Sequence, residues 1–210
     1  DTLPDTLVAA VADTRAPLPL LAFTAARWWD RRDRTAQALT AEGYAAIGGV
    51  AGALAQHAEE TLARIGPARE ALVRELFRNL VTAQGTRAVI GWDELTSVSP
   101  DREAAEAVLR ELVDARLLTS YEEPATPGHA PARRVEIVHE SLLTMWPRLV
   151  RWRTQDEGGA QLRDQLRQAA HLWDEKGRSG DRLWTGTAYR EYALWRERYD
   201  APLTAVEAAY

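Results

Sequence analysis

RRVEIVHESLLTMWPRLVRWR, residues 133–153, changes its hydrophobic period part-way along. Val135 to Val138 reads as a short strand, whereas the apolar residues that follow Glu140 recur at helical spacing. The sequence therefore predicts a strand that passes directly into an amphipathic helix, with His139 and Glu140 at the junction. Pro147 lies within that helix and predicts a kink or a restart near Trp146, because proline removes one helical hydrogen bond. The helical stripe consists of Leu142, Leu143, Trp146, Leu149 and Val150.

The region before this junction has the element order of a winged helix. Three amphipathic helices are predicted, and two short apolar runs separated by a Pro/Gly-rich loop at 124–131 predict a hairpin. The sequence thus predicts a winged-helix domain over residues 66–140. Its helices are expected at 67–82, 92–98 and 101–118, and its strands at 117–121 and 135–138.

The two flanking regions are helical in pattern. Residues 1–65 are predicted to form a helical domain, in which Thr40 caps a short helix and Gly48-Gly49 makes a turn. Residues 141–210 are predicted to form a C-terminal helical extension, with turns at Gly158-Gly159 and at 177–180. The predicted fold class is therefore mainly α, with a helical domain, a winged-helix domain containing one small β-hairpin, and a C-terminal helical extension.

Composition excludes several classes of protein. The 210-residue chain has a formal net charge of -5 and no cysteine, so disulfides and thiolate metal sites are excluded. No long uncharged apolar run is present, so we expect no membrane span and a cytoplasmic location. The chain begins at Asp1 without a signal-like segment, and we expect it to be part of a longer protein.

Motifs for catalysis and for metal binding are missing. No Gly-Lys-Ser/Thr follows Gly48-Gly49, and Lys176 is the only lysine. His139-Glu140 begins like a zinc metalloprotease helix, but Leu143 stands where the second histidine is needed. We therefore expect no catalytic residue, no metal ligand and no independent enzyme activity.

A fold of this kind is compatible with two functions that need no enzyme activity. A winged-helix transcription regulator would use the third helix and Arg133 and Arg134 to bind DNA. That helix is acidic, so we do not expect nucleic acid as a partner. A helical protein-interaction scaffold would use the surplus C-terminal aromatic residues. The acidic residues are Asp101, Glu103, Glu106, Glu111 and Asp114, and the aromatic ones are Trp184, Tyr189, Tyr192 and Tyr199.

His139 admits two interpretations. An isolated histidine at a strand-to-helix junction commonly caps the helix or fills a satisfied core position. The unpaired N–H groups and the dipole of a helix N-terminus also favour an anion nearby, so a nucleotide diphosphate is a sensible ligand for this junction.

Five stretches in order resemble STAND-class signal-transduction ATPases, in particular the bacterial branch associated with WD40 or other repeats. These are LPLLAF (18–23), YAAIGGVAGALAQHAEE (44–60), DARLLTSYEE (114–123), VEIVHESLLTMWPRLVRW (135–152) and LRQAAHLWDEKGR (166–178). The resemblance implies that the chain follows a P-loop ATPase core in the same polypeptide and precedes a repeat sensor domain. It also implies homo-oligomerisation on activation.

The same resemblance suggests which residues bind nucleotide in the intact protein. Pro19 matches the proline that lies against adenine, although Ala16-Pro17 stands where the family has glycine. Val138-His139-Glu140 matches a Met-His-Asp motif whose histidine contacts the β-phosphate of ADP, with Glu140 as a brace. The implied function is that of a non-catalytic regulatory arm. It couples the ADP/ATP state of the core to conformational change and oligomerisation. The core is expected to bind the nucleotide with magnesium, whereas this chain alone is expected to hold no cofactor.

Overall fold

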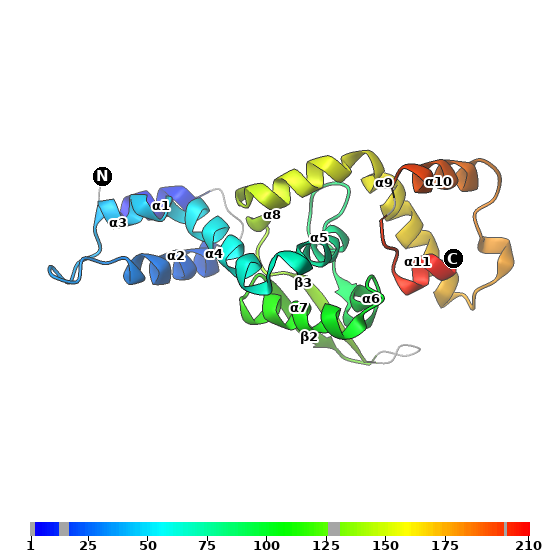
Figure 1. The fold of residues 1–210 in the computed structure, drawn as a ribbon, viewed down its shortest axis with the longest axis horizontal. Helices are drawn as coiled ribbons and strands as arrows, with labels where there is room; N and C mark the ends of the chain where they lie inside the picture. The colour runs from blue at the N-terminus through cyan, green and yellow to red at the C-terminus, as the bar shows by residue number, and fades with distance from the viewer. Residues whose placement is uncertain (1–2, 13–16, 126–130, 200) are drawn as a thin grey trace.

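The computed structural model describes residues 3–12, 17–125, 131–199 and 201–210, and only the backbone of residues 3–4, 11, 17–20 and 156–158. The chain is mainly helical with one small antiparallel sheet, which confirms the predicted class. Figure 1 shows an elongated molecule in which the sheet lies between two helical ends. No helix in the described ranges is long and apolar enough to cross a membrane.

Four helices form the N-terminal end: α1 (Leu3–Val11), α2 (Pro17–Asp30), α3 (Ala41–Ala46) and α4 (Gly49–Ile65). The predicted cap of α3 is confirmed, because the Thr40 hydroxyl accepts the Gly43 N–H at 3.0 Å. The turn into α4 passes through Gly48 and Gly49, whose φ angles of 71° and 66° suit glycine. The predicted break at Gly48-Gly49 is therefore confirmed.

The central unit runs from the 3₁₀ turn η1 (Pro67–Arg69) to β3. It contains α5 (Glu70–Asn79), β1 (Ile90–Gly91), α6 (Trp92–Thr96), α7 (Arg102–Asp114), β2 (Leu118–Glu123) and β3 (Ala132–Ile137). The predicted hairpin is present, with Leu118 opposite Ile137. β1 adds a third strand on the other side of β3, so the sheet order is β1-β3-β2. A strand of two residues leaves no periodic signal in sequence, so it was not predicted.

All three helices of this unit end before the predicted residue, and α6, predicted over 92–98, ends at Thr96. The helix expected over 67–82 begins as η1 and ends at Asn79, because Thr82 instead forms a turn with Thr86 through a backbone hydrogen bond of 2.9 Å. The third helix ends at Asp114, and Arg116, with φ 56°, turns the chain into β2. The predicted loop at 124–131 includes residues 126–130, which lie outside the described residues.

The segment after β3 forms α8 (Leu142–Met145) and α9 (Pro147–Glu175). Pro147 begins α9 in its first turn, so the predicted restart is confirmed. The predicted interruption at Gly158-Gly159 is wrong, because α9 continues through both residues and only changes direction midway (Figure 1). A Cβ on Gly159 would collide with the Trp195 indole, so glycine allows close packing here.

The C-terminal end folds back on α9. It consists of η2 (Gly180–Arg182), α10 (Gly186–Arg198) and α11 (Ala205–Ala209), and α11 packs against α9. A capping box between Thr204 and Glu207 begins α11. The Ala205 N–H also donates to the Ser97 hydroxyl at 2.8 Å, which joins the C-terminal end to the central unit. α11 is too short to have been predicted from periodicity.

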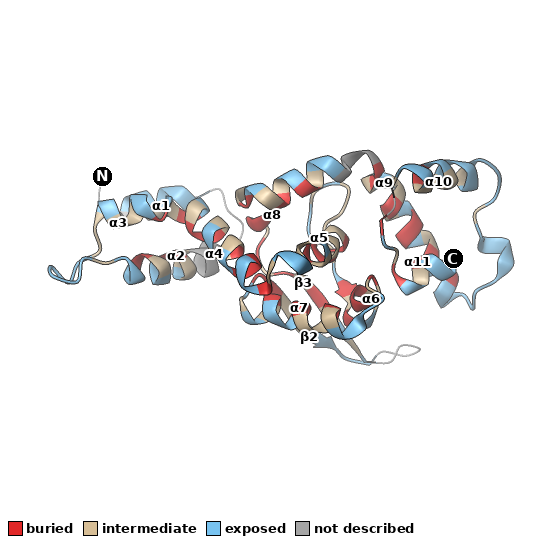
Figure 2. Ribbon diagram, viewed as in Figure 1, coloured by how far each residue is buried: buried red, intermediate tan, exposed pale blue. Residues whose placement is uncertain are grey.

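One large core joins the three regions (Figure 2). Its buried residues come from α4, the central unit, α8 and the first turns of α9. The core therefore extends across the predicted boundaries at residues 65 and 140, and packing ties these regions together. The largest of its fully buried side chains are Trp146, Phe77, Leu76, Leu80, Leu95, Leu109, Leu112, Leu117, Leu118, Ile137, Leu142 and Leu143.

Candidate functional site

His139 lies between the end of β3 and the first turn of α8, where its side chain is only 7% exposed. Its Nδ1 accepts the Ser141 N–H at 3.2 Å. Because Nδ1 accepts this hydrogen bond, Nε2 is the ring atom that could carry a proton and donate it to a phosphate oxygen. The backbone of the junction is also fixed, because the His139 carbonyl accepts the Leu142 N–H at 3.0 Å.

This geometry fits both interpretations of His139. The Nδ1 contact satisfies the N–H of Ser141, the residue that precedes α8, as expected of a histidine in a satisfied position at a helix start. The same contact fixes the tautomer and the ring plane, as a phosphate-binding histidine requires. His139 thus lies in an ordered junction, and its side chain is mostly covered.

Arg87 supports the same junction from the loop before β1. Its Nη1 donates to the Ile137 carbonyl at 2.9 Å and lies 3.4 Å from the Glu136 carboxylate. One guanidinium thus holds both the backbone and a side chain at the end of β3, next to His139. Sequence reasoning missed Arg87, because its partners lie about fifty positions away and no local pattern indicates them.

The other two predicted site residues lie in different surroundings. Glu140 is half-buried beside His139, and its carbonyl accepts the Leu143 N–H at 2.9 Å, so it takes part in the first turn of α8. Pro19 lies in the first turn of α2, and its side chain is outside the described residues. The structure therefore brings His139 and Glu140 together and does not place the Pro19 side chain.

A polar clamp connects the junction to α4 and α5. The clamp consists of Glu59, Glu70, Trp146 and Arg148. The Arg148 guanidinium donates to both Glu59 oxygens at 2.8 to 3.1 Å and to Glu70 at 2.7 Å. The buried Trp146 indole also donates to Glu59, at 2.8 Å. The hydrogen bonds from Arg148 and Trp146 lower the pKa of Glu59, and Glu59 in turn raises the pKa of Arg148.

The arginines that a DNA-binding winged helix would use are engaged within the protein. Arg134 pairs with Glu123 at 2.6 Å, and the Arg133 guanidinium lies 3.6 Å from the centre of the Trp92 ring. On α7, Arg102 pairs with Asp93 and Glu106, and Arg110 pairs with Glu106 at 2.6 Å. A phosphate backbone would therefore have to displace intramolecular carboxylates.

The C-terminal aromatic residues pack mainly against one another. Trp184 lies edge-on to Tyr192 and to Tyr210, with ring centroids 6.3 and 5.8 Å apart. Trp195 is buried and stacks on Tyr199, whereas Tyr189 is 57% exposed. This arrangement is a small aromatic core with one exposed edge.

The described residues contain no group of three His, Asp or Glu side chains placed to hold a metal ion. Neither the curated proteins nor the solved structures contain a match to this chain. The family model described as Novel STAND NTPase 1 does match, over residues 1–181. That match covers most of the 210 residues, and the chain belongs to the Novel STAND NTPase 1 family.

Proposed function

We propose that this chain is the non-catalytic regulatory arm of a STAND-type ATPase switch, in which residues 66–140 act as the winged-helix domain. A P-loop core in the same polypeptide would bind ADP or ATP with magnesium, and His139 would contact the β-phosphate of ADP. Family membership supports the class of protein. The observation that carries the role of His139 is its ordered ring, whose Nδ1 accepts the Ser141 N–H.

The proposed coupling follows from how the junction is connected. His139 is followed directly by α8 and α9, and Arg148 in the first turn of α9 is bound to Glu59 on α4 and Glu70 on α5. A shift at the junction would therefore be transmitted to α4 and α9 together. ADP can stabilise the closed state only through its higher affinity for that state, and a single phosphate contact supplies such a difference.

DNA binding is the weaker alternative. The paired arginines of the wing and the acidic α7 both oppose contact with phosphate rows. We expect no salt-dependent affinity of this chain for duplex DNA in a fluorescence anisotropy titration. Tight duplex binding that weakens steeply with salt would favour the transcription-regulator function instead.

The proposal is tested in the intact protein by replacing His139. His139→Asn keeps an acceptor for the Ser141 N–H but removes Nε2, so it separates the capping role from the phosphate contact. Loss of a hydrogen bond to a charged phosphate costs about 1.5–3 kcal/mol, so ADP should dissociate roughly 10- to 150-fold faster. The basal activity of the switch should rise, because less of the protein remains in the state that ADP stabilises.

The matched control is His171→Asn, which changes a half-exposed histidine on α9 in the same way. ADP release is measured by stopped-flow with a fluorescent ADP analogue. Unchanged release from His139→Asn, or equal acceleration by the control, would remove His139 from the mechanism.

A further inference from the structure

The second half of α9 and the helices after it form a unit of their own, which we call the C-terminal unit. It comprises the described residues from Ala160 onward. Arg167 of α9 lies 3.6 Å from the Glu207 carboxylate of α11, and the ring centroids of Trp173 and Tyr210 are 5.7 Å apart. Charge and aromatic contact therefore hold α11 to this half of α9.

The large apolar core does not extend into the C-terminal unit. Among the described residues of that core, the last one on α9 is Trp152. Leu166, Trp173 and Trp195 are buried within the C-terminal unit and lie outside both apolar cores. Between these two parts α9 changes direction at Gly158-Gly159, where the helix is weakest because glycine is a poor helix former (Figure 1).

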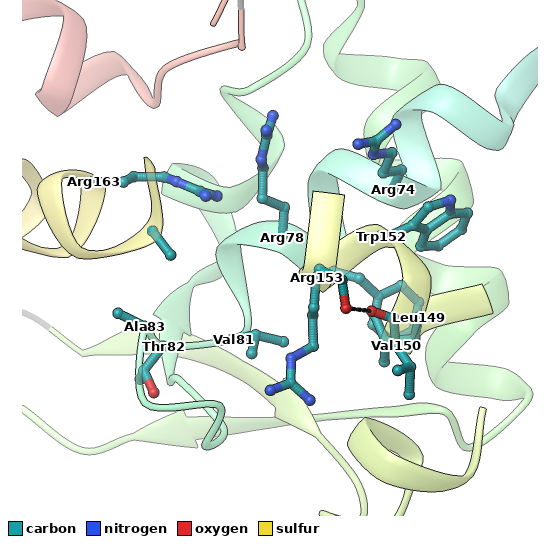
Figure 3. A pocket seen from close by; sticks show the side chains of 13 residues that line it. Arg74, Arg78, Val81, Thr82, Ala83, Leu149, Val150, Trp152, Arg153 and Arg163 are labelled. Atoms are coloured by element: carbon teal, nitrogen blue, oxygen red, sulfur yellow. Dashed lines mark hydrogen bonds between the residues drawn. The ribbon is translucent and has the colours of Figure 1, made fainter. Parts of the chain in front are cut away.

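A pocket of about 160 Å³ lies at this change of direction, between α5, the loop after it and α9 (Figure 3). Its lining includes Trp152 before the glycine pair and Ala160 after it. α9 therefore passes along a pocket between the part that packs in the core and the part that carries the C-terminal unit. Four arginines also line the pocket, namely Arg74 and Arg78 of α5 and Arg153 and Arg163 of α9.

Two polar contacts hold the C-terminal unit to α5 and to the loop after it. The Arg167 guanidinium donates to the Asn79 side-chain oxygen at 2.9 Å, and both residues are buried. The Ala83 N–H donates to the Asp164 carboxylate at 2.7 Å. Buried polar groups need such partners, so these contacts fix the position in which the unit docks.

Two further polar contacts hold the C-terminal unit to α6. His171 Nε2 lies 2.9 Å from the Glu94 carboxylate, and the Ala205 N–H donates to the Ser97 hydroxyl at 2.8 Å. We call these four contacts the polar latch. Hydrogen bonds and partly exposed ion pairs stabilise less than an apolar core, so this interface should open before the large core does.

The contact between His171 and Glu94 depends on charge. The Glu94 carboxylate raises the pKa of His171 above its ordinary value of about 6.5, although burial opposes this. Two more charged groups among the described residues act on the ring: Arg167 on the same helix lowers the pKa, and Glu207 on α11 raises it. The docked state therefore binds more protons at His171 than the released state, so docking weakens as the pH rises through the raised pKa.

We propose that the C-terminal unit is a hinged element, which moves away from the central unit at Gly158-Gly159 when His171 loses its proton and the polar latch weakens. Opening uncovers Glu94 and Ser97 on α6, which the docked unit contacts. His139 takes no part in the latch, so this device is independent of the proposed contact with ADP.

The test is amide hydrogen exchange of the 210-residue chain, measured by NMR between pH 6.5 and pH 8. The Ala83 and Ala205 N–H groups report on the latch, because each is bonded across it. Their protection factors should fall roughly two- to fivefold as the pH rises, which is the effect of a partly exposed ion pair. The Ala104 N–H, bonded to Asp101 within the central unit, and the Trp146 indole N–H should keep theirs.

Two variants make the test specific. His171→Gln keeps a donor for Glu94 but cannot be charged, so protection of the two reporters should be low and equal at both pH values. His57→Gln, at a half-buried histidine outside the latch, should keep the pH dependence. Circular dichroism checks that both variants fold.

Three results would overturn the proposal. The first is protection of Ala83 and Ala205 that does not change with pH in the wild-type chain. The second is a pH-dependent loss of protection that persists in His171→Gln. The third is an equal loss at the Trp146 indole, because the first turn of α9 would then open together with the C-terminal unit.

Discussion

The two apolar cores of this chain differ in how they are closed. The large core gathers buried residues from α4, the central unit, α8 and α9, whereas the small one consists of Trp28, Ile47 and Ala53. α4 contributes to both, because its residues Val50 and Ala53 face different cores. The large core holds all of the largest fully buried side chains and is therefore closed more completely than the small one, which lies under half-exposed helices.

Polar contacts add to the apolar residues Leu7 and Phe23, which pack against both cores, in connecting the small core to the rest of the molecule. Arg27 on α2 donates to His57 on α4 at 3.0 Å, and His57 Nε2 contacts the Ala115 carbonyl at 2.7 Å. Arg27 also pairs with Glu60. Hydrogen bonds of this kind stabilise less than a core does, so the N-terminal helices should open before the central unit unfolds.

The largest expected effect is from truncation within the large core. Phe77 is fully buried and lies edge-on to Trp146, with ring centroids 5.2 Å apart. Phe77→Ala should lower the free energy of unfolding by about 3–5 kcal/mol, measured by urea denaturation. Leu194→Ala, at an exposed position of α10, is the control. A change below 1 kcal/mol for Phe77→Ala would contradict the picture of one tightly packed core.

A smaller effect is expected from the polar clamp, which joins α4 to the first turn of α9. Arg148→Ala removes one partner of Glu59 and the ion-pair partner of Glu70, and should cost about 1–2 kcal/mol because the groups are partly exposed. Arg151→Ala removes an exposed arginine from the same turn of α9 and should change stability by less than 0.5 kcal/mol. Equal effects of the two substitutions would show that Arg148 acts only through helix propensity.

The smallest expected effect is a pH dependence of the free energy of unfolding, which is caused by His57. Burial lowers the pKa of His57 below 6.5, so folding favours the neutral ring. The folded state binds fewer protons there, and stability should rise with pH from the lowered pKa up to about 6.5 and then level off. His57→Gln removes this rise. Thermal melts of both proteins from pH 5 to 8 check it, and an unchanged difference in Tm across that range would contradict it.

Much of the fold could be predicted because the signals are local. The period of the apolar residues predicted α4, α7 and the hairpin, and Pro147 predicted the restart between α8 and α9. The cap at Thr40 followed from its side chain alone. Each of these depends on residues within a few positions of one another, where hydrogen bonding and side-chain spacing decide the outcome.

The candidate site could be predicted only in part. The junction at His139 was visible, because a strand pattern changes into a helix pattern there. The residues that hold it were not, since Arg87 and the clamp have partners 50 to 89 positions away. Nothing near an arginine in sequence tells which distant carboxylate or carbonyl it will reach.

The sequence by itself determined the helical class, the position of the sheet and the junction at His139, because hydrophobic period and turn residues act over short distances. Only the tertiary structure decided that α9 continues through Gly158 and Gly159, where Trp195 packs against a residue without a side chain. It also decided that four arginines from α5 and α9 meet around one pocket. Both outcomes depend on contacts between segments far apart in the chain, which local propensity does not encode.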